Sequence, residues 1–254
     1  KLLRTVKVNA FTTKNGEQYG EIIKGDEVMN YPLNSNEFSM VVKSLYLKEN
    51  NAIMDEKEWS EWKEYLKIEA YNNKLDYDLE IRVAEREEGL YYNLDNDTCT
   101  TIFLSEGKCE RIWTPERMFK RTKTFKNQIE PDLDADIKQL PTWLRKHFNL
   151  KNEDEIILLT LYLVTCLRGL YMKYPMLVCY GEKGASKSTF LRMQKAIVDP
   201  ENLDLMPMPK TRDDLQIRLH NSYFVTLDNL SYLSKKDSDL LATAISGSTA
   251  VRRQ

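Results

Sequence analysis

The fold of this chain is decided by the stretch Gly181-Glu182-Lys183-Gly184-Ala185-Ser186-Lys187-Ser188-Thr189. An apolar run, residues 176–180, precedes it, and an amphipathic run, residues 190–198, follows it. Strand, glycine-bearing loop and helix in this order are the context in which a match to the Walker A pattern is meaningful. Backbone amides of such a loop surround phosphate oxygens at the N-terminus of the helix. The sequence therefore predicts that residues 181–189 bind a nucleoside triphosphate.

The loop carries the two side chains that this chemistry needs. Lys187 is expected to meet the β- and γ-phosphates of ATP, and the Ser188 hydroxyl to hold Mg²⁺. One position departs from the pattern GxxxxGK[ST], because Ser186 stands where the last glycine belongs. A small side chain can fit there, so the prediction is kept.

A second motif follows in the run Tyr223-Phe224-Val225-Thr226-Leu227-Asp228-Asn229. Strand-forming residues that end in an acid, downstream of a P-loop, are typical of a Walker B strand. Asp228 is then expected at the carboxyl edge of the strand, where it orients the Mg²⁺ shell together with Ser188. Each motif alone is modest, but the two in this order predict a nucleotide site.

Composition sets the outer bounds on fold and partners. The chain has 254 residues, 42% hydrophobic and 30% charged, which suits one large or two ordinary globular domains. A net charge of −2 offers no bulk attraction to nucleic acid, so any such partner needs a local basic surface. Four cysteines without CxxC spacing and two histidines argue against a zinc site and favour reduced thiols in a cytoplasmic protein.

The most apolar segment, residues 156–166, is too short to span a bilayer. Three acids, at positions 153–155, precede it, and Arg168 follows it. We therefore expect a buried core helix and no membrane partner.

Residues 1–126 are predicted to form an α+β domain with an antiparallel sheet. Asn15-Gly16 marks a hairpin within residues 6–23, and Ser35 is the expected N-cap of the first helix. Further strands are expected at 27–33, 79–84, 89–94, 100–104 and 109–113, and a second helix at 56–72. The spacing of its apolar residues predicts that they lie in the core: Trp59, Trp62, Tyr65, Leu66 and Ala70.

One segment of this domain, residues 111–126, is strongly basic. Its cations are Arg111, Arg117, Lys120, Arg121, Lys123 and Lys126, against the single acid Glu116. Such a run is either a solvated face before a linker or, since Phe119 and Phe125 interleave the charges, a contact to a nucleic-acid backbone.

Residues 127–141 are polar, acidic and bounded by prolines, which predicts a linker. Residues 142–254 are expected to form a helical prefix, with helices at 142–148 and 154–171, and then the N-terminal part of an α/β P-loop NTPase domain. Beyond the P-loop helix, Thr211 is the expected N-cap of a helix at 213–219.

Three segments of the chain carry a family resemblance. They are residues 174–189, Leu227-Asp228-Asn229-Leu230-Ser231, and the helix to Ile245 with the following Ser246-Gly247-Ser248-Thr249-Ala250-Val251-Arg252-Arg253. They resemble the ATPase core of replicative helicases or primase-helicases of phages and bacterial mobile genetic elements. The likeness extends over most of the chain, although the specific motifs lie in its last third. The small residue before the lysine is similar to that of minichromosome-maintenance helicases, which makes Ser186 less anomalous.

This resemblance implies an AAA+ ring ATPase, a homo-hexamer that uses ATP and Mg²⁺ to translocate on single-stranded or forked DNA, with other replication proteins of the same element as further partners. It also implies that residues 247–253 open a β-hairpin toward a DNA channel. Arg252 and Arg253 are then candidates for DNA contact or for sensing nucleotide across subunits, or they form a solvated hairpin face.

Two departures from the family pattern matter for catalysis. Asn229 stands where most AAA+ proteins have the glutamate that polarises water, so the catalytic candidates are Lys187, Asp228 and Asn229. An amide can orient water but cannot take its proton, so hydrolysis is slow or borrows an acid such as Glu182. Both ends look cut from a longer chain, and we expect sensor residues and an arginine finger to follow Gln254.

Three functions remain open at this point. The first is an ATP-dependent DNA helicase-like motor in the replication of a phage or chromosomal island. The second is a nucleotide-gated DNA-binding initiator or loader with little hydrolysis, which Asn229 favours. The third is a non-catalytic DNA-binding role of the N-terminal domain.

Overall fold

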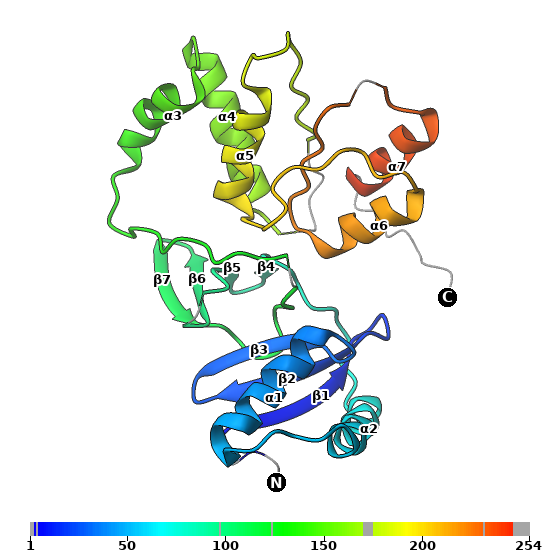
Figure 1. The fold of residues 1–254 in the computed structure, drawn as a ribbon. Helices are drawn as coiled ribbons and strands as arrows, with labels where there is room; N and C mark the ends of the chain where they lie inside the picture. Colours follow the sequence, from blue (N-terminus) through cyan, green and yellow to red (C-terminus); the bar gives the residue numbers. More distant parts are fainter. Residues whose placement is uncertain are drawn as a thin grey trace. The chain divides into compact units, whose positions relative to one another are not determined.

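The computed structural model describes residues 3, 5–96, 98–122, 124–169, 175–230 and 232–245 (Figure 1). The chain divides into two compact units. The first unit comprises Lys1–Arg82, Asn93–Ile102 and Arg111–Lys123, and the second comprises Val83–Tyr92, Phe103–Glu110 and Thr124–Gln254. Each unit is described by itself. Among the described residues, no helix is both long and apolar enough to cross a membrane.

The first unit is built on a three-stranded antiparallel sheet. Its strands β1 (Lys7–Thr12), β2 (Gln18–Lys24) and β3 (Glu27–Pro32) are hydrogen-bonded in sequence order. The predicted hairpin at Asn15-Gly16 is confirmed, and Gly16 has the positive φ of 83° that its turn requires. The strand expected at 27–33 is confirmed as β3.

Two helices follow the sheet, as predicted. Helix α1 spans Asn36–Asn50, and the Ser35 side chain accepts a hydrogen bond from the N–H of Phe38, so Ser35 is the N-cap. Helix α2 spans Glu56–Asn72, and Asp55 caps it in the same way. Short polar side chains at these positions satisfy backbone donors that have no partner within the helix, which is why the boundaries can be read from the sequence.

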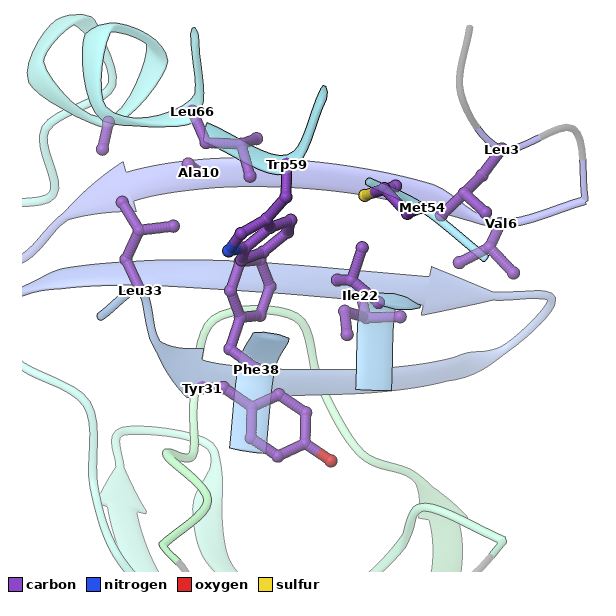
Figure 2. Packing of buried hydrophobic residues seen from close by; sticks show 12 residues of the cluster. Leu3, Val6, Ala10, Ile22, Tyr31, Leu33, Phe38, Met54, Trp59 and Leu66 are labelled. Atoms are coloured by element: carbon purple, nitrogen blue, oxygen red, sulfur yellow. The ribbon is translucent and has the colours of Figure 1, made fainter. Parts of the chain in front are cut away.

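The main core of the first unit lies between the helices and one face of this sheet. Figure 2 shows the rings of Phe38 and Trp59 side by side above the strands, with their centroids 6.2 Å apart. The prediction that Trp59 lies in the core is confirmed, as it is for Leu66 and Ala70, while Trp62 packs partly buried against them. Tyr65 is the exception: it is 60% exposed, because it lies on the side of α2 away from the sheet.

Three cations of the predicted basic run, Arg117, Lys120 and Arg121, are paired or buried within the first unit. Arg117 pairs with the fully buried Glu21 of β2, with 3.5 Å between Nε and Oε1. Lys120 is buried, and Arg121 forms an ion pair with the buried Asp95. For these three cations, neither a solvated face nor a contact to a phosphate backbone applies. The physical reason is that the acids they pair with come from distant strands and loops, which a local charge count cannot include. Arg111 and Lys126 are exposed, so both alternatives stay open for them, and Lys123 lies outside the described residues.

A second sheet has the order β4 (Val83–Arg86), β5 (Gly89–Asn93), β6 (Thr100–Ser105) and β7 (Lys108–Trp113). The strands expected at 89–94, 100–104 and 109–113 are confirmed within one residue. The strand expected at 79–84 begins only at Val83. Glu80 instead forms an isolated parallel bridge with Phe119.

The second unit contains a 3₁₀ turn (Ile137–Gln139) and five helices among its described residues. The helices are α3 (Leu140–Phe148), α4 (Glu153–Cys166), α5 (Lys187–Val198), α6 (Arg212–Asn221) and α7 (Lys235–Ile245). The predicted helices are confirmed, including the cap of α6 by Thr211, although α4 ends at Cys166 and not at 171. Side chains of α3, α4 and α5 form one apolar cluster.

Helix α4 is not the fully buried helix that its composition predicts. One face packs in the core through Ile156, Leu159, Leu163 and Cys166, while Ile157, Leu158, Leu161 and Val164 are more than half exposed. A helix can bury only the faces against which other elements pack. Among the described residues, those elements cover one side of α4.

Two expected strands have no regular ladder in the structure. Residues 176–180 lie in no helix or strand, and within the described chain they pair with no strand. The segment expected as the Walker B strand has only a parallel bridge between Leu227 and Met206. A strand requires a hydrogen-bonded neighbour along its length, and these segments lack one, so the α/β P-loop fold stays a prediction.

Side chains outside the helix complete the C-terminal end of α5. The amide of Gln128 donates to the carbonyl oxygens of Ala196 at 3.2 Å and Ile197 at 2.9 Å. The Tyr92 hydroxyl donates to the carbonyl oxygen of Val198 at 3.0 Å. The last carbonyls of a helix have no partner within it, so these contacts fix the end of α5.

Candidate functional site

The loop before α5 turns through three residues with positive φ. Gly181 and Gly184 have φ of 148° and 85°, and Ser186 has φ of 56° with ψ of 22°. The left-handed conformation of Ser186 explains why a glycine usually stands at this place in the pattern. A residue with a Cβ stands there at a cost of roughly 1–2 kcal/mol. Ser186 thus adopts the left-handed conformation that the glycine of the pattern would have.

Lys187 is the first residue of α5 and reaches back across the loop. Its ammonium donates to the carbonyl oxygens of Gly181 at 3.0 Å and Glu182 at 2.7 Å. Residues 181–186 are exposed and Lys187 is half-buried, so the loop is open to solvent. A flexible cation beside exposed backbone at the start of a helix suits an anionic ligand.

Ser188 meets Asp228 although 40 residues separate them. The Ser188 hydroxyl donates to Oδ2 of Asp228 at 2.8 Å. The Asp228 backbone N–H donates to the Met206 carbonyl oxygen at 2.8 Å, which holds the acid in place. The structure thus brings together the hydroxyl of one motif and the carboxylate of the other.

The Asp228 segment belongs to a parallel pairing. Met206 and Leu227 form a parallel bridge, and α6 lies between them in the sequence. Parallel neighbours need a crossover connection, for which a helix is the usual solution. The pairing is limited to this one bridge, so the α/β sheet stays a prediction.

Asn229 follows Asp228 in a left-handed conformation, with φ of 57°. Asparagine tolerates this conformation better than most residues. Its backbone N–H donates to Oδ1 of Asp228 at 3.0 Å, and the residue is exposed. Its amide side chain can orient a water molecule but cannot accept a proton from one.

The oxygens of Ser188 and Asp228 are of the type that Mg²⁺ prefers. Among the described residues, no group of three or more His, Cys, Asp or Glu side chains gathers as a metal site. Mg²⁺ at nucleotide sites takes most of its ligands from phosphates and water, so one hydroxyl and one carboxylate suffice from the protein. The pair fits such an ion.

Cys179 lies just before the loop, and the charge of Lys187 affects the pKa of its thiol. Partial burial raises the pKa of Cys179 above the ordinary value, and the positive charge of Lys187 opposes this rise.

The remaining predicted site residues divide into two groups. Glu182, Lys183, Ala185 and Thr189 are exposed on the loop or the first turn of α5. Arg252 and Arg253, the candidates for DNA contact, lie outside the described residues.

Sequence reasoning missed two residues of this region, Lys195 and Asp199. They form a buried ion pair at the C-terminal end of α5. Their i, i+4 spacing was visible, but charged pairs at this spacing are usually exposed, and nothing local marks this one as buried.

Residues 142–254 match the family model described as the actinomycete integrative conjugative element replication protein. The match indicates a replication protein of a mobile genetic element, as the resemblance had led us to expect. It begins within α3 and includes α4–α7 and both motifs. Searches among curated proteins and among solved structures found no match.

Proposed function

We propose that this chain binds ATP with Mg²⁺ at residues 181–189 and acts as an ATP-dependent, helicase-like motor on DNA during replication of a mobile element. The observation that carries the proposal is the 2.8 Å contact between the Ser188 hydroxyl and the Asp228 carboxylate. A hydroxyl at the start of a helix beside a carboxylate from a distant segment is the arrangement that holds Mg²⁺ at P-loop sites. The family match supplies the replication context.

Each residue has a separate task in this proposal. The loop amides and Lys187 bind the phosphates, and the hydroxyl of Ser188 and the carboxylate of Asp228 hold Mg²⁺. When bound, the ion neutralises charge on the β- and γ-phosphates. An AAA+ fold and a hexameric ring are part of the proposal and rest on the resemblance.

A second function is favoured by Asn229. Because the residue beside Asp228 carries an amide and no base, ATP can act as a gate for an initiator or loader without rapid turnover. DNA-stimulated hydrolysis separates the two functions. Rapid turnover on forked DNA, with strand displacement that Lys187→Ala abolishes, supports the motor, whereas binding and assembly with negligible turnover support the loader.

Replacing Lys187 with alanine is expected to weaken ATP binding about 10-fold to about 100-fold, because one hydrogen bond between charged groups is lost. Titration calorimetry with ATP and Mg²⁺ measures the change. Lys235→Ala, an exposed lysine at the start of α7, is the matched control and should leave the affinity unchanged. Equal affinities of the Lys187→Ala variant and the unsubstituted protein would exclude this nucleotide site.

ATP is expected to slow the alkylation of Cys179. The thiolate is the reactive form, and the charge of Lys187 lowers the thiol pKa and so raises the thiolate fraction. A bound triphosphate offsets that charge, so the pKa rises and less thiolate is present near pH 8. Lys187→Met without ATP should slow the reaction for the same reason.

Mass spectrometry after iodoacetamide treatment gives the rate at each cysteine. The exposed Cys109 on β7 is the internal control and should react equally with and without ATP. Protection of both thiols, or of neither, would count against a nucleotide at the loop.

A further inference from the structure

A cluster of buried charges lies at the C-terminal end of α5. The Lys195 side chain is 1% exposed, and its ammonium lies 2.9 Å from Oδ2 of Asp199 and 3.1 Å from Oε2 of Glu201. Both carboxylates are fully buried, and Glu201 also pairs with Arg218 of α6. Charges removed from water to this extent must remain paired, because an isolated buried ion is very unfavourable.

This cluster holds the backbone of one residue in the Asp228 segment. The N–H of Phe224 donates to Oδ2 of Asp199 at 3.0 Å. The carbonyl oxygen of the same residue accepts a hydrogen bond from Lys195. Both backbone groups of Phe224 are therefore bound by the ion pair, which we call the α5 clamp.

The spacing of the two attachments matches along both elements. Lys195 follows Ser188 by seven residues, two turns of helix, so they lie on the same face of α5 about 10 Å apart along its axis. Asp228 follows Phe224 by four residues, which span up to about 13 Å of extended chain. The segment thus runs alongside α5 in the opposite direction, attached by Phe224 at one end and by Asp228 at the other.

We infer that Lys195 and Asp199 are positioning residues that set the register of residues 224–228 against α5, so that the Asp228 carboxylate meets the Ser188 hydroxyl. A shift of the segment by one residue would take the Phe224 N–H and carbonyl away from both partners and leave a buried ion pair without its hydrogen bonds. Lys195 and Asp199 act through their contacts with Glu201 and Phe224. The role of the clamp in magnesium binding rests on the proposed function.

Two measurements on the full chain test the clamp, with Asp199→Asn as the variant. The amide keeps the volume of the carboxylate but loses its charge. Arg192→Met is the matched control, because Arg192 lies on the same helix and its ion pair with Asp204 is about half exposed.

The first measurement is hydrogen exchange without nucleotide. In the Asp199→Asn variant, the peptide covering residues 223–229 should exchange faster than in the unsubstituted protein, while a peptide covering α4 should keep its rate. In the Arg192→Met variant, the 223–229 peptide should keep its rate. Unchanged exchange at 223–229 overturns the inference, whatever the chain binds.

The second measurement is the gain in ATP affinity that Mg²⁺ provides. Groups that hydrogen-bond directly to metal ligands change metal affinity about 10-fold to about 100-fold. Asp199 acts one step further away, through Phe224, so Asp199→Asn should reduce this gain by about 10-fold, the lower end of that range, and leave the affinity in EDTA unchanged. In an Asp228→Asn background, Asp199→Asn should produce no further loss. If Asp199→Asn lowers the ATP affinity equally with and without Mg²⁺, or lowers it further in the Asp228→Asn background, Asp199 has only a structural role.

The two proposals fail in different ways. If the unsubstituted chain binds no ATP, the proposed function and the positioning role both fall, while hydrogen exchange still shows whether the clamp orders residues 223–229. If ATP binds and the gain from Mg²⁺ is insensitive to Asp199, only the positioning role falls.

Discussion

Replacing Phe38 with alanine is expected to lower the free energy of unfolding of the first unit by about 3–5 kcal/mol. The ring is fully buried between Trp59 and the sheet, and its loss leaves a cavity that the strands cannot collapse to fill. Urea denaturation followed by tryptophan fluorescence measures the change, since Trp59 reports from the same core. Met40→Ala on the same helix is the control, because that side chain is 67% exposed and should change stability by less than about 0.5 kcal/mol.

The same contact can be approached from the strand. A Cβ on Gly20 would lie 2.3 Å from the Cε2 and Cζ atoms of Phe38, so Gly20→Ala should destabilise the unit by about 1–3 kcal/mol. Leucine lacks those two ring carbons, and Gly20→Ala should therefore be tolerated better in a Phe38→Leu background. Strict additivity of the two substitutions would contradict the packing described here.

Replacing Lys195 with methionine is expected to lower the free energy of unfolding of the second unit by about 3–5 kcal/mol. The substitution keeps most of the volume but leaves Asp199 and Glu201 as buried carboxylates without their shared cation. It also removes a hydrogen bond to the backbone of Phe224. Thermal unfolding followed by circular dichroism measures the loss.

The control for this second prediction is Arg192→Met. The ion pair of Arg192 with Asp204 is about half exposed on both sides, and such pairs contribute about 1 kcal/mol or less. If Lys195→Met destabilises the protein no more than Arg192→Met, the buried ion pairs of Lys195 contribute no more to the free energy of unfolding than an exposed pair.

Much of the fold could be predicted from local pattern. The turn at Asn15-Gly16, the caps Ser35 and Thr211 and the helices that follow them are fixed by contacts within a few residues. The same holds for the loop at 181–186, where the left-handed Ser186 occupies the place that the motif reserves for glycine. These features can be predicted from a short segment, because the hydrogen-bond partners that form a turn or a cap lie within a few residues of one another.

Burial could be predicted from apolar spacing for most of the residues of α2 that we expected in the core, but not for α4 or the basic run. The apolar composition of α4 gave no indication of which residues face solvent, and the basic run at 111–126 gave no indication that Arg117 pairs with Glu21. The apolar run at 176–180 has strand composition, yet within the described chain it finds no ladder partner. Each of these outcomes depends on groups far away in the sequence.

The sequence by itself determined the capped starts of α1 and α6, the hairpin at Asn15-Gly16 and the presence of a P-loop motif followed by an acid. The order of the two motifs also predicted that Ser188 and Asp228 lie together, and the structure shows their contact. Only the tertiary structure decided that Lys195 and Asp199 bind the backbone of the segment that carries this acid. The physical reason is the range of the interactions. Turns and caps are satisfied locally, whereas a buried charge or a shared ligand pair is defined by the distant residues that exclude water and complete its hydrogen bonds.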